Sequence, residues 1–111
     1  MRLRKPLVTM TAVLFVPLLA GVASVESTSV GRTLTVNGFE MYYEVRGEGE
    51  PLVLLHGITG SGSFFEPMVN DFAKEYRVIV PDLRGHGRST NPSNEFTHRQ
   101  AAQDVFAFWI I

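Results

Sequence analysis

The stretch Leu52-Val53-Leu54-Leu55-His56-Gly57-Ile58-Thr59-Gly60-Ser61-Gly62-Ser63 decides the fold of this chain. Its first four residues are apolar and follow Pro51, which is typical of a short strand buried on both faces of a parallel sheet. Residues 56–63 form a loop beyond the carboxyl end of that strand, where open α/β sheets bind their ligands. The glycines of this loop favour positive φ and a close approach of the backbone to a ligand. The stretch therefore predicts an α/β fold in which backbone N–H groups of this loop contact a ligand.

A β-hairpin is predicted immediately before this stretch. Asn37-Gly38 is a turn pair that favours the type I′ geometry of tight hairpins. Apolar and polar side chains alternate on both sides of it, and the apolar ones are Leu34, Val36, Phe39, Met41, Tyr43 and Val45. This pattern predicts two antiparallel strands at the edge of a sheet.

A β-α-β unit is predicted around the loop. Pro67 fits the first position of a helix, where its missing N–H costs no hydrogen bond. One face of that helix is apolar and consists of Val69, Phe72, Ala73 and Tyr76. The run Val78-Ile79-Val80 then predicts a strand parallel to the first, joined to it by a right-handed crossover. Thr97-His98-Arg99-Gln100 has capping-box spacing and predicts the start of a further helix.

A second glycine-rich motif, Asp82-Leu83-Arg84-Gly85-His86-Gly87-Arg88-Ser89, follows the second predicted parallel strand. Its two glycines permit a tight turn, which we expect Asp82 with Arg84 or Arg88 to lock by hydrogen bonds and charge. His86 lies between the turn glycines, a place that is usually exposed, and the sequence identifies no carboxylate to orient its ring. We therefore do not assign His86 as a catalytic base.

Two motifs together resemble the α/β-hydrolase family. Residues 56–60 read His-Gly-x-x-Gly, as in the family's oxyanion loop, and residues 82–89 read Asp-x-Arg-Gly-x-Gly-x-Ser. The resemblance extends from Thr33 to about Phe108. It implies the N-terminal part of an α/β-hydrolase sheet, with an antiparallel β-hairpin, a parallel β-α-β unit and the start of a further helix.

The resemblance also implies a role for the loop. The backbone N–H of Ile58 is expected to donate to an oxyanion, while His56 and Gly57 shape the turn. Phe64 and Phe65 are expected to line a substrate pocket, and the alternative is that they staple the helix to the sheet. No metal or cofactor is implied.

The family's catalytic triad is missing from the chain. Its nucleophile lies in a G-x-S-x-G turn, with the acid and the histidine after it, and no serine here has a glycine both two residues before and two residues after it. The resemblance therefore places all three residues beyond Ile111. We expect a hydrolase of small ester, amide or related bonds, represented by a portion that is not catalytically competent. The alternatives are a non-catalytic small-molecule-binding protein of the same fold and an inactive fragment.

A phosphate-binding loop is the competing interpretation of the glycine-rich stretch. Residues 57–62 have the glycine spacing of a Walker A motif after a strand. Ser63 occupies the position of the lysine that would reach the phosphates. The sequence therefore does not favour nucleotide binding.

The first 23 residues have the pattern of a secretory signal. Residues 1–5 form a basic n-region with Arg2, Arg4 and Lys5, Pro6 to Ala20 form an apolar run, and Gly21-Val22-Ala23 is a small-x-small cleavage sequence. We expect cleavage after Ala23, a linker over residues 24–32, a partial domain over 33–111, and a secreted or periplasmic protein. The alternative is an uncleaved anchor, since the run is near the minimum length for a membrane helix. A membrane is a partner only in that case.

Charge and composition exclude other classes of partner. The formal charge is −1, and removal of the three basic leader residues lowers it by three, to −4. No basic patch remains, so nucleic acid is not expected as a partner. The chain has no cysteine, which excludes disulfides and thiol catalysis. The expected partner is a small-molecule substrate.

Overall fold

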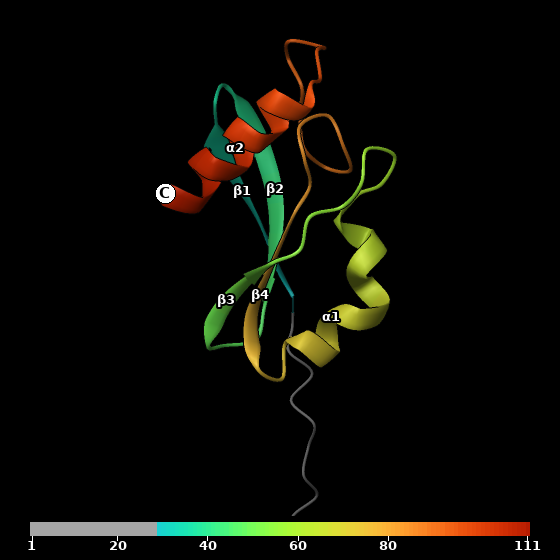
Figure 1. Ribbon diagram of the computed structural model, residues 1–111, viewed down its shortest axis with the longest axis vertical. Coiled ribbons are helices and arrows are strands. Elements are labelled where there is room, and N and C mark those ends of the chain that lie inside the picture. The colour runs from blue at the N-terminus through green and yellow to red at the C-terminus, as the bar shows by residue number, and fades with distance from the viewer. Residues whose placement is uncertain (1–28) are drawn as a thin grey trace, which may run out of the picture.

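The computed structural model describes residues 29–111 (Figure 1). The predicted leader and residues 24–28 of the predicted linker lie outside this range. The elements in chain order are β1 (Val30–Val36), β2 (Phe39–Arg46), β3 (Glu50–Val53), the 3-10 helix η1 (Gly62–Phe65), α1 (Glu66–Phe72), β4 (Tyr76–Pro81) and α2 (His98–Ile110). β1 thus takes in residues 30–32, which were predicted as linker.

The four strands form one mixed sheet in the order β1-β2-β4-β3. β1 and β2 are antiparallel and meet at the pair Val36 and Phe39, and the two turn residues between them have φ of 43° and 80°. Positive φ at both positions defines a type I′ turn, so the predicted hairpin is confirmed. β3 and β4 pair in parallel, which confirms the predicted β-α-β pairing. The α/β fold class is thereby established.

The sheet has a hydrophobic cluster on each face. On the α1 side, Val69 of the helix packs with Val78 and Val80 of β4. On the α2 side, β1 and β2 contribute Val36, Phe39 and Met41, against which Ala107 and Phe108 of the helix pack. Alternate residues of a strand point to opposite faces, so the two helices cover opposite sides of the sheet. The result is a three-layer arrangement, with α1 against β4 on one face of the sheet and α2 against β1 and β2 on the other.

The helices begin close to their predicted starts. α1 begins at Glu66 and has its proline in the first turn, one residue before the predicted start at Pro67. α2 is capped as predicted, because Thr97 Oγ1 accepts a hydrogen bond from the backbone N–H of Gln100 at 3.1 Å. Within residues 29–111, no helix has both the length and the apolar character that crossing a bilayer requires.

The prediction that residues 52–55 are buried on both faces is wrong. β3 ends at Val53, although the Leu54 N–H still donates to the Ile79 carbonyl at 3.0 Å. Leu54 packs on the α1 side, but Leu55 is 47% exposed. The physical reason is that β3 is the last strand of the described sheet, so nothing in residues 29–111 pairs with its outer edge or covers its α2 side.

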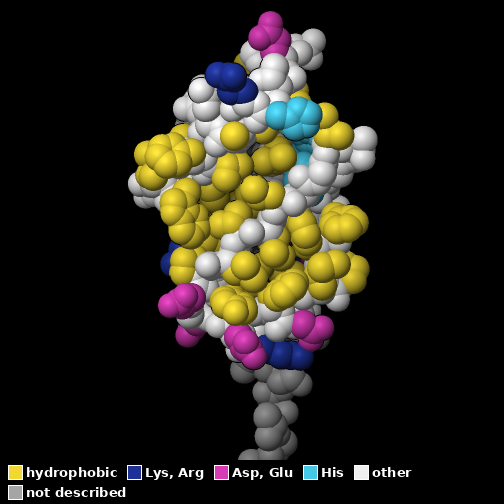
Figure 2. Space-filling view, viewed as in Figure 1, with side chains coloured by type: hydrophobic (Ala, Val, Ile, Leu, Met, Phe, Trp, Pro, Cys, Tyr) yellow, Lys and Arg dark blue, Asp and Glu magenta, His cyan; other side chains and the backbone are white. Residues whose placement is uncertain are grey.

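The uncovered side of β3 forms an apolar groove with α2. Figure 2 shows apolar side chains spread over this face. The groove measures about 670 Å³, and its apolar lining residues include Val53, Leu55, Leu83, Val105, Phe106 and Trp109. An open strand edge beside an apolar groove is a template for pairing with another chain.

We expect residues 24–111 alone to self-associate through this edge. Size-exclusion chromatography should show oligomers, and Leu55→Lys should reduce them because it places a charge in the apolar groove that association would bury. Val30→Lys is the matched control: Val30 is 50% exposed on the opposite edge, and its replacement should leave the oligomers unchanged. A stable monomer with cooperative unfolding would contradict this expectation.

Candidate functional site

His56 is a buried structural residue at the carboxyl end of β3. Its Nε2 accepts a hydrogen bond from the Leu83 N–H at 3.0 Å. That contact requires an unprotonated Nε2, so Nδ1 carries the hydrogen and donates to the Gly57 carbonyl at 2.7 Å. Both ring nitrogens are therefore occupied, and His56 ties its own loop to the start of the second motif.

The Gly57–Ile58 peptide is held by its carbonyl oxygen. Besides the His56 ring, the Gly60 N–H donates to the Gly57 carbonyl at 3.0 Å. In a trans peptide the N–H points away from the carbonyl of the same unit, so the Ile58 N–H points away from His56 and Gly60. No acceptor within residues 29–111 bonds to this N–H. The Ile58 N–H, at the residue that the sequence singled out, is thus one of several loop donors without an acceptor among the described residues, which also include the N–H groups of Gly57, Thr59 and Ser61.

The loop glycines do not have the positive φ that was predicted for them. Gly57, Gly60 and Gly62 are not among the described glycines with positive φ, so that part of the prediction is wrong. Only Gly62 has no room for a side chain: a Cβ there would lie 2.8 Å from Val80 Cγ1 and 3.0 Å from Asp82 Oδ1. Close approach to the protein's own strand, rather than backbone conformation, requires glycine at this position.

Asp82 fastens the second motif to the loop through backbone donors. Its carboxylate accepts from the Gly62 N–H at 2.6 Å and from the Arg88 N–H at 2.9 Å. The predicted lock is thus confirmed for Arg88, although the backbone makes it and not the guanidinium. Ser89 closes the turn by donating to the Asp82 carbonyl at 2.6 Å and accepting from the Tyr42 N–H at 2.9 Å.

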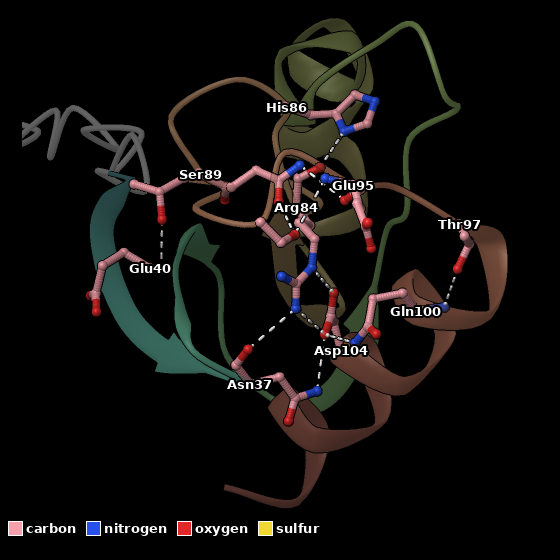
Figure 3. Close-up of polar contacts among 12 residues, drawn as sticks. Asn37, Glu40, Arg84, His86, Ser89, Glu95, Thr97, Gln100 and Asp104 are labelled. Atoms are coloured by element: carbon pink, nitrogen blue, oxygen red, sulfur yellow. Dashed lines mark hydrogen bonds and ion pairs between the residues drawn. The ribbon is translucent and has the colours of Figure 1, made fainter.

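Arg84 pairs with Asp104 of α2, not with Asp82. The two side chains are 7% and 0% exposed, and Arg84 donates from Nε at 2.9 Å and from Nη2 at 3.0 Å. Asn37 and Gln100 also donate to Asp104 Oδ1, at 2.9 and 3.1 Å (Figure 3). One buried carboxylate therefore joins the hairpin turn, the second motif and α2.

Burial raises the pKa of the Asp104 carboxyl, but the hydrogen bonds from Arg84, Asn37 and Gln100 and the charge of Arg84 outweigh it. The net effect is a pKa below the usual value for aspartate. The motifs of the sequence did not single out Asp104. A usable signal was present, because Asp104 lies among Ala101, Val105 and Phe108 on the apolar face of the helix, where an ionised residue needs a partner.

His86 lies across the gap between the two motifs and is partly buried. Its Nδ1 is 2.8 Å from the Arg84 carbonyl, and its Nε2 is 2.5 Å from the Ile58 carbonyl. The ring is 5.1 Å from those of His56 and Phe96, centroid to centroid. Both ring nitrogens face carbonyl oxygens. The expected exposure is wrong, because the ring packs against the loop of residues 56–63.

Phe64 and Phe65 lie in different environments. Phe65 packs on the cluster of Val69, Val78 and Val80, which agrees with the stapling alternative. It also borders a cleft of about 350 Å³ between β2 and α1. Phe64 is 66% exposed and contacts the Phe65 ring edge-on at 5.3 Å. Lining of a substrate pocket by either ring stays a prediction.

Within the described residues, no group of three or more His, Asp or Glu side chains is placed to hold a metal ion. The serines near the loop are also engaged. Ser61 and Ser63 share a hydrogen bond at 2.7 Å, and Ser89 is used by the turn. The arrangement supplies a donor at the loop but assembles no nucleophile beside it.

The model of the α/β hydrolase fold family matches residues 50–110 of this chain. The match spans both motifs and covers more than half of the sequence. The chain therefore belongs to the α/β-hydrolase family.

Several characterised relatives are hydrolases. The chain is 43% identical over 70 residues to a soluble epoxide hydrolase of Corynebacterium sp. strain C12, covering 63% of this chain and 24% of the relative. It is 42% identical over 62 residues to (E)-2-((N-methylformamido)methylene)succinate hydrolase of Acinetobacter baylyi, covering 55% and 24%. It superposes on the epoxide hydrolase CorEH with a TM-score of 0.69 and 37% identity, covering 73% of this chain and 29% of that one. The chain thus spans about a quarter of the length of these relatives.

Proposed function

We propose that this chain is the oxyanion-binding portion of a hydrolase that acts on small esters, amides or related bonds, with epoxides among the related substrates. The nucleophile, base and orienting acid would come from residues beyond Ile111. The proposal is supported by family membership and by the relatives described above.

The observation that carries the proposal is the free N–H of Ile58. It lies at the carboxyl end of β3 on a peptide whose carbonyl is held by two donors, the His56 ring and the Gly60 N–H. Donors that are fixed before the reaction stabilise developing negative charge without reorganising. An oxyanion develops in the hydrolysis of esters and amides, and also when water cleaves the ester of a carboxylate nucleophile that has opened an epoxide.

A non-catalytic binding protein with the same loop is the second candidate. The hydrogen bond of His56 with the Leu83 N–H supports this candidate, because it ties the loop to the protein's own backbone and would keep the loop's shape in a protein that has lost its nucleophile. A G-x-S-x-G turn, or a close variant with another nucleophile, downstream of Ile111 separates the two candidates.

The test compares residues 24–111 with the protein extended through its natural reading frame beyond Ile111, termed here the extended protein. Each is assayed with an activated ester and with a small epoxide. The extended protein should turn over one of them. Residues 24–111 should give no rate above buffer, because they lack the nucleophile, the base and the second oxyanion donor, which in this family is the N–H of the residue after the nucleophile.

Two further readouts accompany this assay. A serine-directed phosphonate should not label residues 24–111, and labelling at Ser61, Ser63 or Ser89 would refute the proposal. The extended protein recovered from the extracytoplasmic fraction should have the intact mass of a chain that begins at Ser24, which tests the proposed export. If the reading frame beyond Ile111 contains neither a G-x-S-x-G turn nor a variant of it with another nucleophile, the non-catalytic binding protein is supported instead.

A further inference from the structure

The two histidines of the motifs form reciprocal contacts between the loops. His56, from the first loop, bonds to Leu83 of the second motif, and His86, from the second motif, reaches Ile58 of the first loop. Figure 3 shows the His86 ring turned back toward Arg84, whose carbonyl meets its other nitrogen. The Arg84 side chain is itself fixed by Asp104, so His86 projects from an anchored turn.

We propose that His86 is a positioning residue that fixes the oxyanion donor at Ile58, an inference that rests on the proposed function. Ile58 is flanked by two peptide units. His56 holds the carbonyl of the first, and His86 holds the carbonyl of the second. With both carbonyls held, the backbone on either side of the Ile58 Cα is set and its N–H keeps one direction.

The ring chemistry identifies the nitrogen that matters. Carbonyl oxygens only accept, so each contact of His86 needs an N–H on the ring. The neutral imidazole carries one N–H. When Nε2 carries it, the ring holds Ile58, and when Nδ1 carries it, the ring holds only Arg84. The Nε2–H form is therefore the one that positions the donor.

Ile58 needs this support on its second peptide unit, because the bonds from His56 and Gly60 hold only the first. Its side chain is 55% exposed, and its own N–H has no partner within the described chain. The ring of His86 is in turn held edge-on against Phe96. Removal of the Nε2 donor should leave the fold in place and free the second peptide unit to rotate.

Three substitutions separate the donor from the ring. His86→Gln places an N–H near the position of Nε2, His86→Asn places one only near Nδ1, and His86→Phe keeps the ring packing without a donor. In the extended protein, we expect His86→Phe and His86→Asn to lower kcat by about 10- to 100-fold, less than the 10²–10³ for an oxyanion donor removed outright. KM should be unchanged, and His86→Gln should restore most of the rate.

Amide relaxation of Ile58 gives a readout that does not depend on activity. The order parameter should be near that of rigid backbone, about 0.85, in the wild type and His86→Gln, and should fall toward about 0.6 in His86→Phe and His86→Asn. If the wild-type extended protein is inactive, the proposed function fails while this arm still tests His86. A rigid Ile58 in all variants, or a rate loss that His86→Gln does not restore, would overturn the inference.

Discussion

Asp104→Ala in the extended protein should lower the free energy of unfolding by about 3–5 kcal/mol, the range for breaking a buried ion pair from one side. The substitution leaves the Arg84 guanidinium, whose side chain is 7% exposed, without its counter-charge. It also removes the acceptor used by Asn37 and Gln100. Urea unfolding at neutral pH measures the change.

Asp71→Ala is the matched control for this substitution. Asp71 also pairs with a cation, Lys74, at 2.7 Å, but both side chains are more than 70% exposed. Solvent screens such a pair, so the unfolding midpoint should stay at the wild-type value. Equal destabilisation by the two substitutions would show that the Asp104 network does not stabilise the fold.

The same network predicts the pH dependence of stability. The pKa of Asp104 is lower in the folded protein than its ordinary value, so its contribution is complete above the unfolded pKa and is lost as pH falls through the folded pKa. The wild type should therefore lose stability below about pH 4, near the pKa of unfolded aspartate. Asp104→Asn should flatten this part of the curve, and parallel curves for the two proteins would contradict the assignment.

Ile58→Pro in the extended protein should lower kcat by about 10²–10³-fold, the usual cost of one lost oxyanion donor. Proline has no N–H, so the substitution removes the proposed donor directly. KM should change little, because the interaction is made in the transition state and not in the ground state. Steady-state kinetics on the substrate identified by the assay measures both constants.

Ile58→Val is the control for this substitution. It keeps the N–H and alters a side chain that is 55% exposed, so its kcat should match the wild type. An unchanged urea midpoint in Ile58→Pro shows that the fold is intact. Retention of kcat by Ile58→Pro, or an equal loss in Ile58→Val, would remove Ile58 from the mechanism.

The sequence predicted correctly those parts of the fold that depend on residues close together in the chain. Asn37-Gly38 specifies a type I′ turn through its own backbone preferences, and that turn formed. The Thr97 cap depends on residues three positions apart, and it also formed. The parallel pairing of β3 and β4 followed from strand, loop, helix and strand in that order.

The remaining features depend on contacts between distant residues, which the sequence does not display. Leu55 is as apolar as its neighbours, yet its exposure depends on which strand lies beside β3. The motif offered Asp82 as a partner for Arg84, but the partner is Asp104, 20 residues away in α2. The contact between His86 and Ile58 spans 28 residues and needs both loops folded before it exists.

The candidate site was predicted only in part, because some of its features also depend on contacts between distant residues. The motif pointed to Ile58, whose N–H has no acceptor among the described residues, and its role as an oxyanion donor stays a prediction. The glycines were assigned a conformational role, whereas Gly62 is needed because it contacts Val80 and Asp82 closely. Packing against a strand that comes later in the chain cannot be inferred from the loop alone.

A crystal structure of the extended protein with a bound oxyanion analogue tests the central claim most directly. If the substrate is an ester, the ligand is a covalently bound phosphonate. If the substrate is an epoxide, the ligand is the trapped ester that the carboxylate nucleophile forms with it. The Ile58 nitrogen should lie about 2.7–3.1 Å from the analogue's oxygen, the range for an oxyanion donor. An oxygen bound by other donors, with the Ile58 N–H directed elsewhere, would contradict the claim that this loop is the oxyanion site.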